Sequence, residues 1–430
     1  MRRLPIATLG AAVGVLTVVP LLTTVTASAS AGPIQMPDSA LSPSTTTVGG
    51  ASVLPTTRTV AHWFGTATNP ANGVTYGFNM IGADPSLNQS TTVTADIIPV
   101  NVVVDGAAYN GSDVVGPTLA SPVFADNNYA STPRSTQADS TGTTGDFFTS
   151  GGPLSPASTN NQLEDATMRS QFNKGGTGYH LLLNPVVHPA ITIDVPGNVG
   201  TQIVSGRGVL AADIKISWWS AELQNLDNTL GYVDPTHLPI YLTNNVMLYT
   251  GSNPSAGCCV IGYHGAGKVP GNGGGSVNGN GNNAVQTFAW GSYVTPGFFN
   301  PQYDWALQDI HALSHEISEW ADDPFTNNAV EPWLTPTAPQ YGCTGILETG
   351  DPVVGIGFAM GANAFDQGPT PNGTQVADGY YHPEDEVFLP WYMRSNPSDA
   401  EAVQGGTTGR YTLMGNLNPF SGFHVPATGC

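Results

Sequence analysis

Apolar and polar residues alternate along several short stretches of the chain, in the pattern of half-buried β-strands. The alternation is clear at Val74–Met80, and Thr91–Val104 is a longer β-branched run that ends at the turn signal Asp105-Gly106. The alternation over Val285–Tyr293 is that of an exposed edge strand. Further strands are predicted at Tyr179–Leu183, Ala190–Val195 and Ile240–Tyr249.

Helical spacing of apolar residues occurs in three places. It predicts helices at Gln162–Phe172 and Ile214–Leu230. The third helix begins at Asn300-Pro301, where an N-cap residue precedes a proline in the first turn. It spans Pro301–Ala321, and Asp322-Asp323-Pro324 ends it. Strands and few helices together predict an α+β protein with a twisted sheet and this helix beside it.

The N-terminus has the pattern of a secretory signal. Arg2 and Arg3 precede the apolar stretch Leu4–Leu22, and small residues at Ala27–Ala31 supply a cleavage site. The rival interpretation is a membrane anchor, but the flanking residues favour cleavage, and no later run approaches the ~18 apolar residues of a spanning helix. We therefore expect a secreted, extracellular protein that has no membrane contact after cleavage.

Four regions follow from these patterns. Residues 1–31 are the signal peptide, and 32–60, rich in Ser, Thr and Pro, are a linker or propeptide. Residues 61–237 form a β-rich N-terminal part, and 238–430 form a second part that carries the candidate chemistry. Within them, Ser131–Asn161 is a long polar loop, and Gly265–Asn283 is a Gly- and Asn-rich loop that is a candidate rim or lid.

Composition narrows the class of protein further. Of 430 residues only 10% are charged, while 52 are Gly and 35 are Pro, which favours a loop-rich extracellular protein over a helical bundle. The formal net charge of -20 repels nucleic acid and anionic membranes, so we expect neither as a partner. We expect a monomer.

The four cysteines also agree with export. An even number in a secreted chain suggests two disulfides. We discount a bond between the neighbours Cys258 and Cys259, which would close a strained ring. Each of them is then expected to pair with one of Cys343 and Cys430.

The candidate chemistry lies on His311–Asp322, within the third helix. His315 and Glu319 are four residues apart, so about 400° of rotation and ~6 Å of rise bring both side chains toward one cation. Glu316 is rotated by ~100° from His315, which places it as a general base beside the metal. This is the logic of the His-Glu-x-x-His helix of metalloproteases, with glutamate in place of the second histidine.

A catalytic zinc needs a third protein ligand. Glu348 and Asp351, separated by Thr349-Gly350, are the first candidates, and His264 is a further one. His311 replaces Glu319 as the partner of His315, supports the site from beside it, or is simply a polar cap over the inner face of the helix. Zn²⁺ is the predicted ion, and Ca²⁺ is the alternative for an acidic turn of this kind.

The motifs in their order resemble the Exordium, or phosphate-induced, family of plants and related uncharacterised secreted bacterial proteins. The resemblance covers roughly residues 240–355, with Thr349 where the family commonly has isoleucine and Cys343 before the acidic run rather than a cysteine after it. It implies a zincin-like scaffold for residues 238–430. It is carried by Cys258-Cys259, Gly262-Tyr263-His264-Gly265, Phe288-Ala289-Trp290, Ser314–Glu319, Asp323-Pro324 and Glu348-Thr349-Gly350-Asp351.

These features predict a secreted zinc-dependent hydrolase, a metallopeptidase that acts through a metal-bound water on a peptide or cell-wall substrate. The alternative is a non-catalytic extracellular protein that binds cell-wall material or glycans and holds a structural metal. Aromatic residues at Gly379–His382 and Leu389–Tyr392 could line a cleft, but we favour core positions for them.

Overall fold

A computed structural model describes much of the chain. The predicted signal (1–31) and most of the predicted linker (32–60) lie outside the described residues, as does the predicted helix start at Asn300-Pro301. The described residues are 58–128, 159–268, 284–299, 307–334, 343–353, 355, 357–365, 368–373, 378–395 and 411–413, with the short strands 137–138 and 144–145.

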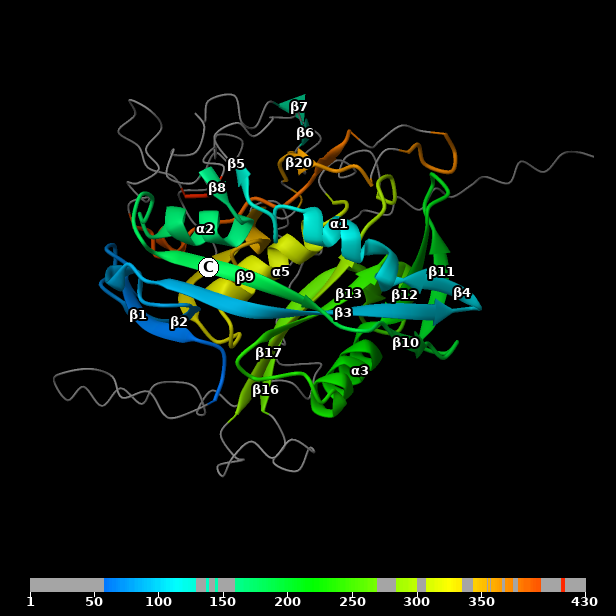
Figure 1. Ribbon diagram of the computed structural model, residues 1–430, viewed down its shortest axis with the longest axis horizontal. Coiled ribbons are helices and arrows are strands. Elements are labelled where there is room, and N and C mark those ends of the chain that lie inside the picture. Colours follow the sequence, from blue (N-terminus) through cyan, green and yellow to red (C-terminus); the bar gives the residue numbers. More distant parts are fainter. Residues whose placement is uncertain are drawn as a thin grey trace, which may run out of the picture.

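A seven-stranded, largely parallel sheet organises the fold (Figure 1). Its strand order is β10-β3-β13-β17-β16, and β9 and β4 also pair with β3. Only β16 on β17 and β4 on β3 are antiparallel. Strands from both sides of residue 238 share this sheet. They are β3 (Ser90–Val104), β4 (Ala107–Asn110), β9 (His180–Val187), β10 (Ile191–Asp194), β13 (Leu238–Asn244), β16 (Gly262–Lys268) and β17 (Val285–Tyr293).

Side-chain alternation along the strands gives the sheet two apolar faces. Ile240 and Leu242 belong to one core cluster, whereas Tyr241 between them belongs to the other. The first face packs against α5 (His311–Asp322) and α2 (Leu163–Gln171), and the second against α3 (Ile216–Thr229). Figure 1 shows α5 and α2 on one side of the sheet and α3 on the other.

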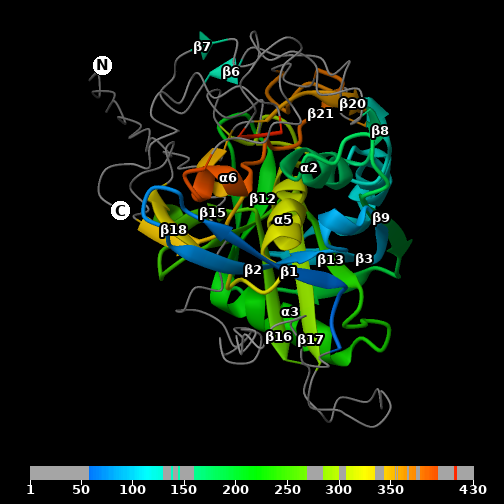
Figure 2. The same cartoon turned by 90° about the vertical axis from the view of Figure 1, so that its left-hand side faces the viewer.

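Smaller elements surround this sheet (Figure 2). A second sheet has the order β11-β12-β14-β15, and the remaining strands form two-stranded pairs. None of the helices in the described part of the chain is long and apolar enough to cross a membrane. The strands are β1 (His62–Thr68), β2 (Thr75–Ile81), β5 (Asn127–Asn128), β6 (Gln137–Ala138), β7 (Thr144–Gly145), β8 (Thr159–Asn161), β11 (Gly200–Val204), β12 (Leu210–Lys215), β14 (Val246–Tyr249), β15 (Cys258–Val260), β18 (Ala329–Leu334), β19 (Cys343–Ile346), β20 (Met360–Ala362) and β21 (Tyr380–Tyr381), and the short helices are α1 (Val115–Ala120), α4 (Pro254–Gly257) and α6 (Leu389–Tyr392).

The long strand β3 and its turn were predicted correctly. The two turn residues, Asp105 and Gly106, have φ angles of 52° and 79° and join β3 to β4 in a tight hairpin. The predicted strand Ile240–Tyr249 is instead two strands, β13 and β14. Asn245 separates them with a φ of 49°, a conformation that asparagine tolerates better than most residues.

Strand β17 is not the exposed edge strand that we predicted. All nine of its residues are buried, because it lies between β13 and β16. Its polar side chains have buried partners: Thr287 accepts a hydrogen bond from the indole of Trp320 (2.9 Å), and Ser292 accepts one from the amide of Val246 (2.8 Å). Polar positions in this strand therefore mark internal hydrogen bonds and not solvent.

The helix that carries the candidate chemistry begins later than predicted. Leu307–Ile310 is not helical, Asp309 has a φ of 42°, and α5 starts at His311. Asp309 pairs with Val294 in an isolated β-bridge, so this segment is held to the sheet before the helix can begin. The predicted end at Asp322 is confirmed.

The predicted cysteine pairing was wrong. The structure brings the sulfur atoms of Cys258 and Cys259 together, with Cα atoms 3.0 Å apart across a cis peptide bond. This adjacent arrangement is the one that the sequence analysis discounts. Cys343 begins β19, and Cys430 lies outside the described residues.

The two aromatic segments near the C-terminus are mainly core, as we favoured. Tyr381, Trp391 and Tyr392 are buried, whereas Tyr380 is 36% exposed. His382 is also buried, and its Nδ1 lies 2.8 Å from a carboxylate oxygen of Asp309, at the start of α5. These segments are therefore mainly core, and Trp391 and Tyr392 pack against Trp333 of β18.

Gly291 of β17 lies directly beneath α5, and we expect Gly291→Val to destabilise the fold. A Cβ atom at residue 291 would lie 3.0 Å from the Cα of Leu313, a backbone atom that cannot rotate away. Overpacking of this kind costs about 1–3 kcal/mol, which thermal and denaturant unfolding would measure. Gly197→Val is the control, because nothing lies within 4 Å of a Cβ there. Equal stability of the two variants would contradict close packing of α5 on β17.

Candidate metal centre

Helix α5 is buried along its whole length, including its polar residues. Leu313, Ile317 and Trp320 belong to the core cluster between the helix and the sheet. The hydroxyl of Ser318 donates to the carboxylate of Glu164 at 2.7 Å, which ties α5 to α2. Because no face of the helix is turned to solvent, its ionisable side chains must find their partners inside the protein.

His315 and Glu319 lie together as their spacing predicts, and Asp351 joins them. His315 Nε2 lies 3.1 Å from Glu319 Oε1 and 4.0 Å from Asp351 Oδ1, and one ligand atom from each residue lies within 4.8 Å of the others. In a tetrahedral zinc site with bonds of 2.0–2.2 Å, donor atoms are about 3.3–3.6 Å apart. The observed separations bracket that value, so this buried group could hold a metal ion.

The turn that contains Asp351 approaches α5 closely because Gly350 has no side chain. A Cβ atom at residue 350 would lie 2.2 Å from His315 Nδ1. The amide of Gly350 donates to Glu319 Oε1 at 3.3 Å. Glu348 is also buried, but it belongs to neither of the groups in the described residues that could hold a metal. Of the two acids predicted for the third position, the structure therefore brings Asp351 to His315 and Glu319.

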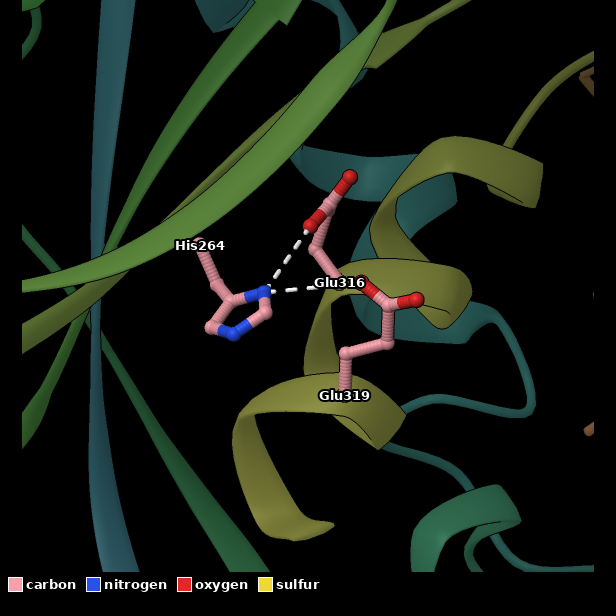
Figure 3. Close-up of side chains that lie close together, drawn as sticks. All are labelled: His264, Glu316 and Glu319. Atoms are coloured by element: carbon pink, nitrogen blue, oxygen red, sulfur yellow. Dashed lines mark hydrogen bonds and ion pairs between the residues drawn. The ribbon is translucent and has the colours of Figure 1, made fainter. Parts of the chain in front are cut away.

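A second group, His264 with Glu316 and Glu319, lies beside the first (Figure 3). His264 is on β16, where the preceding Tyr263 faces the α3 side of the sheet. Alternation then turns His264 toward α5. Its Nδ1 lies 3.3 Å from Glu316 Oε2 and 3.5 Å from Glu319 Oε2. The structure thus places His264 beside the candidate metal-binding residues of α5. From the sequence it was named only as a further candidate ligand.

Glu384 is a residue of the centre that the sequence analysis missed. Its Oε2 lies 2.6 Å from His315 Nδ1 and 3.0 Å from His311 Nε2. Its backbone amide donates to the hydroxyl of Ser314 at 3.0 Å. A carboxylate on the Nδ1 side of a histidine fixes the ring and leaves Nε2 as the ligand atom. His311 therefore lies beside the centre, in contact with Glu384, and does not replace Glu319 as the partner of His315.

One signal could have indicated Glu384. Residues 384–386 are Glu-Asp-Glu, a run of three acids in a chain with only 10% charged residues. All three are buried. An acidic run bounded by aromatic and apolar residues is more consistent with an internal role than with a solvated loop.

Burial and mutual charge shift the pKa values of the whole cluster. Burial raises the pKa of Glu316 to about 7. Burial acts in the same direction on Glu319, but His315 and His264 outweigh it and lower the pKa of Glu319 to about 2. Burial opposes the charge on His264, yet Glu316 and Glu319 raise its pKa to about 10. Burial and neighbouring carboxylates raise the pKa of Asp351 well above its usual value. In the absence of a cation, protons must therefore balance this cluster.

No protein family, curated protein or solved structure matches the chain. The structure confirms the α+β class, and the resemblance to the Exordium family and the zincin-like domain stay predictions. The function must accordingly be argued from the geometry and chemistry of the site.

The raised pKa values predict how the stability of the metal-free protein depends on pH. Burial raises the pKa of Glu316 from 4.5 to about 7, and that of Asp322 and Asp323 from 3.8 to about 7. A carboxyl group with a higher pKa in the folded state favours folding at low pH, and that contribution is lost as the pH rises through the folded pKa. We expect the melting temperature, measured in chelator, to fall between pH 4.5 and 7.

Glu319 does not oppose this trend, because a lowered pKa affects stability only below about pH 4.5. The variant Glu316→Gln removes one titrating group and should give a shallower decline. A melting temperature that is constant or rises over the interval would show that the buried carboxyl groups do not titrate as described.

Proposed function

We propose that the protein is a secreted zinc-dependent hydrolase that cleaves a peptide or a related amide bond. His315, Glu319 and Asp351 hold the metal, and Glu316 is the general base. The observation that carries the proposal is the convergence of one imidazole and two carboxylates, all buried, with a further carboxylate beside them. The zincin-like domain is part of the same proposal, supported by α5 packed on one face of the sheet.

The donor atoms fit zinc. One imidazole nitrogen and two carboxylate oxygens leave an open position on a tetrahedral ion. His315 Nε2 is fully buried and makes no well-aligned hydrogen bond in the described part of the chain; Glu319 Oε1 lies 3.1 Å from it, and a cation bound to both atoms would satisfy them together. A zinc ion there would lower the pKa of a water ligand and polarise a substrate carbonyl.

Glu316 has the position and the pKa of a general base. Its Oε1 lies 3.9 Å from His315 Nε2, and Glu316 does not belong to the group formed by His315, Glu319 and Asp351, so we assign it a place beside the proposed ion. Its Oε2 lies 3.3 Å from His264 Nδ1, which fixes the orientation of the carboxylate. A base is most effective when its pKa is close to the working pH, and burial raises the pKa of Glu316 to about 7.

The substrate class rests on sequence features. The N-terminal pattern favours export, and the formal net charge of -20 disfavours nucleic acid and anionic membranes. Extracellular peptides and peptide parts of cell walls are the amide substrates available to such a protein. The resemblance to the Exordium family supports the scaffold and does not identify a substrate.

A second candidate function is supported by the burial of the centre. Among the residues of the two groups, Asp351 is the most exposed, and its side chain is only 13% accessible. An ion sealed to this degree could be structural, in a non-catalytic protein that binds glycans or cell-wall material. The two functions differ in their response to a chelator: removal of a structural ion would lower the melting temperature sharply, whereas removal of a catalytic ion would abolish hydrolysis with the fold retained.

The variant Glu316→Gln tests the proposed base. It keeps the shape of the side chain and removes its ability to accept a proton. We expect hydrolysis of a quenched fluorescent peptide mixture to fall by about 10²–10⁴-fold, the usual contribution of a general base. Zinc content, measured by elemental analysis, should stay at one ion per chain.

The control is Glu222→Gln, on α3 at the opposite face of the sheet. It should hydrolyse the mixture at the wild-type rate. Wild-type activity in Glu316→Gln would exclude the base role, and failure of that variant to bind the first equivalent of zinc would make Glu316 a ligand of the ion at His315.

A further inference from the structure

We propose that the protein has a second divalent-cation site, formed by His264, Glu316 and Glu319, and that an ion in this site inhibits hydrolysis. The evidence for the site is the arrangement of these three side chains. The inhibition rests on the proposed function, because it presupposes that the protein is a hydrolase. The expected ligand is a divalent metal ion that binds one imidazole and two carboxylates. Zn²⁺ is such an ion.

The three side chains point toward a common place between β16 and α5. Figure 3 shows the imidazole of His264 directed at the two carboxylates, which project from neighbouring turns of the helix. His264 Nδ1 lies 3.3 Å from Glu316 Oε2 and 3.5 Å from Glu319 Oε2, and the ligand atoms all lie within 4.8 Å of one another. These separations match the spacing of about 3.3–3.6 Å between donor atoms around a tetrahedral ion.

Glu319 and Glu316 both lie between His315 and His264, and each turns one oxygen toward each histidine. Glu319 directs Oε1 at His315 Nε2 (3.1 Å) and Oε2 at His264 Nδ1 (3.5 Å). Glu316 directs Oε1 toward His315 Nε2 (3.9 Å) and Oε2 toward His264 Nδ1 (3.3 Å). A carboxylate that bridges in this way can hold two ions about 3.5–4 Å apart, the separation in known two-metal sites. The two groups are therefore adjacent sites that share Glu319.

The second site is a buried, closely packed group and not a cluster of acids on the surface. All three side chains are completely buried. Within the described residues, two atoms of this group, Glu319 Oε2 and His264 Nε2, make no hydrogen bond. Buried carboxylate oxygens without partners are destabilising unless a cation neutralises them. Gly262 lets β16 come close enough, because a Cβ atom at that residue would lie 2.8 Å from Glu316 Cγ.

An ion in the second site would remove the proposed base. Glu316 Oε2 lies 3.3 Å from His264 Nδ1, so a cation beside His264 would take this oxygen as a ligand and hold the carboxylate in the second site. A carboxylate held there cannot turn toward a water at the first site, and that water loses its proposed base. The first ion would stay in place, since His315 and Asp351 are not ligands of the second site. Zinc should therefore activate the protein at one ion per chain and inhibit it at two.

The test is a zinc titration of the chelator-treated protein, with bound zinc measured by calorimetry and hydrolysis by the peptide mixture. We expect two ions per chain in the wild type, with the second weaker, and at least a tenfold fall in rate as the second binds. His264→Ala should bind one ion fewer than the wild type. Excess zinc should change its rate, relative to its own rate with one ion, by less than twofold.

Two further variants complete the test, one as a conservative substitution at residue 264 and one as a control. His264→Gln retains a polar side chain of similar size if His264→Ala does not fold, and it should likewise lose one ion. His62→Ala removes an imidazole that belongs to neither group, and it should retain both ions and the inhibition.

The second site is overturned if the wild type binds a single ion at all zinc concentrations, or if the His264 variants keep the full number of ions. Its inhibitory role is overturned if the second ion binds to the wild type without lowering the rate. Absence of hydrolysis with one ion bound overturns the proposed function and the inhibition together. The loss of one ion from the His264 variants would in that case still establish the site.

Discussion

The pairing of buried imidazoles with buried carboxylates along α5 is the interaction on which the rest of the structure depends. Three histidines and six acids around the helix are almost completely removed from water. Charges in such a place are tolerated only when they are paired with one another, protonated or bound to a cation. The acids outnumber the histidines, so a cation would complete the balance. The residues are His264, His311, His315, Glu316, Glu319, Glu348, Asp351, Glu384 and Glu386.

The fold brings these groups together through the regular geometry of its strands and helix and through three glycines. Alternation on β16 turns His264 toward α5, and the helical repeat aligns His315 with Glu319. Three glycines, Gly262, Gly291 and Gly350, allow two strands and a turn to approach the helix more closely than any side chain would permit. At Gly262 and Gly350 the backbone lies directly against the side chains of Glu316 and His315, so the strand and the turn restrict the positions of these two side chains.

The sequence was most informative where the geometry is local. The four-residue spacing of His315 and Glu319 is a property of the helix alone, so their proximity could be predicted without a structure. Glu384 could not be found in this way, because it meets His315 across 69 residues and follows no periodic pattern. The edge-strand prediction for β17 failed for a related reason: Thr287 and Ser292 are buried against partners that only the tertiary fold supplies. The cysteine prediction differs from the structure because it discounted the proximity of the neighbouring sulfur atoms of Cys258 and Cys259, which the structure brings together.

The central claim is that α5 and the turn at residue 351 hold one catalytic zinc between them. Anomalous diffraction at the zinc absorption edge, from crystals of protein loaded with one equivalent of zinc, tests it directly. The account predicts a single buried peak about 2.0–2.2 Å from His315 Nε2, Glu319 and Asp351. A peak confined to the protein surface, or a buried position at which Asp351 is turned away from the ion, would contradict it.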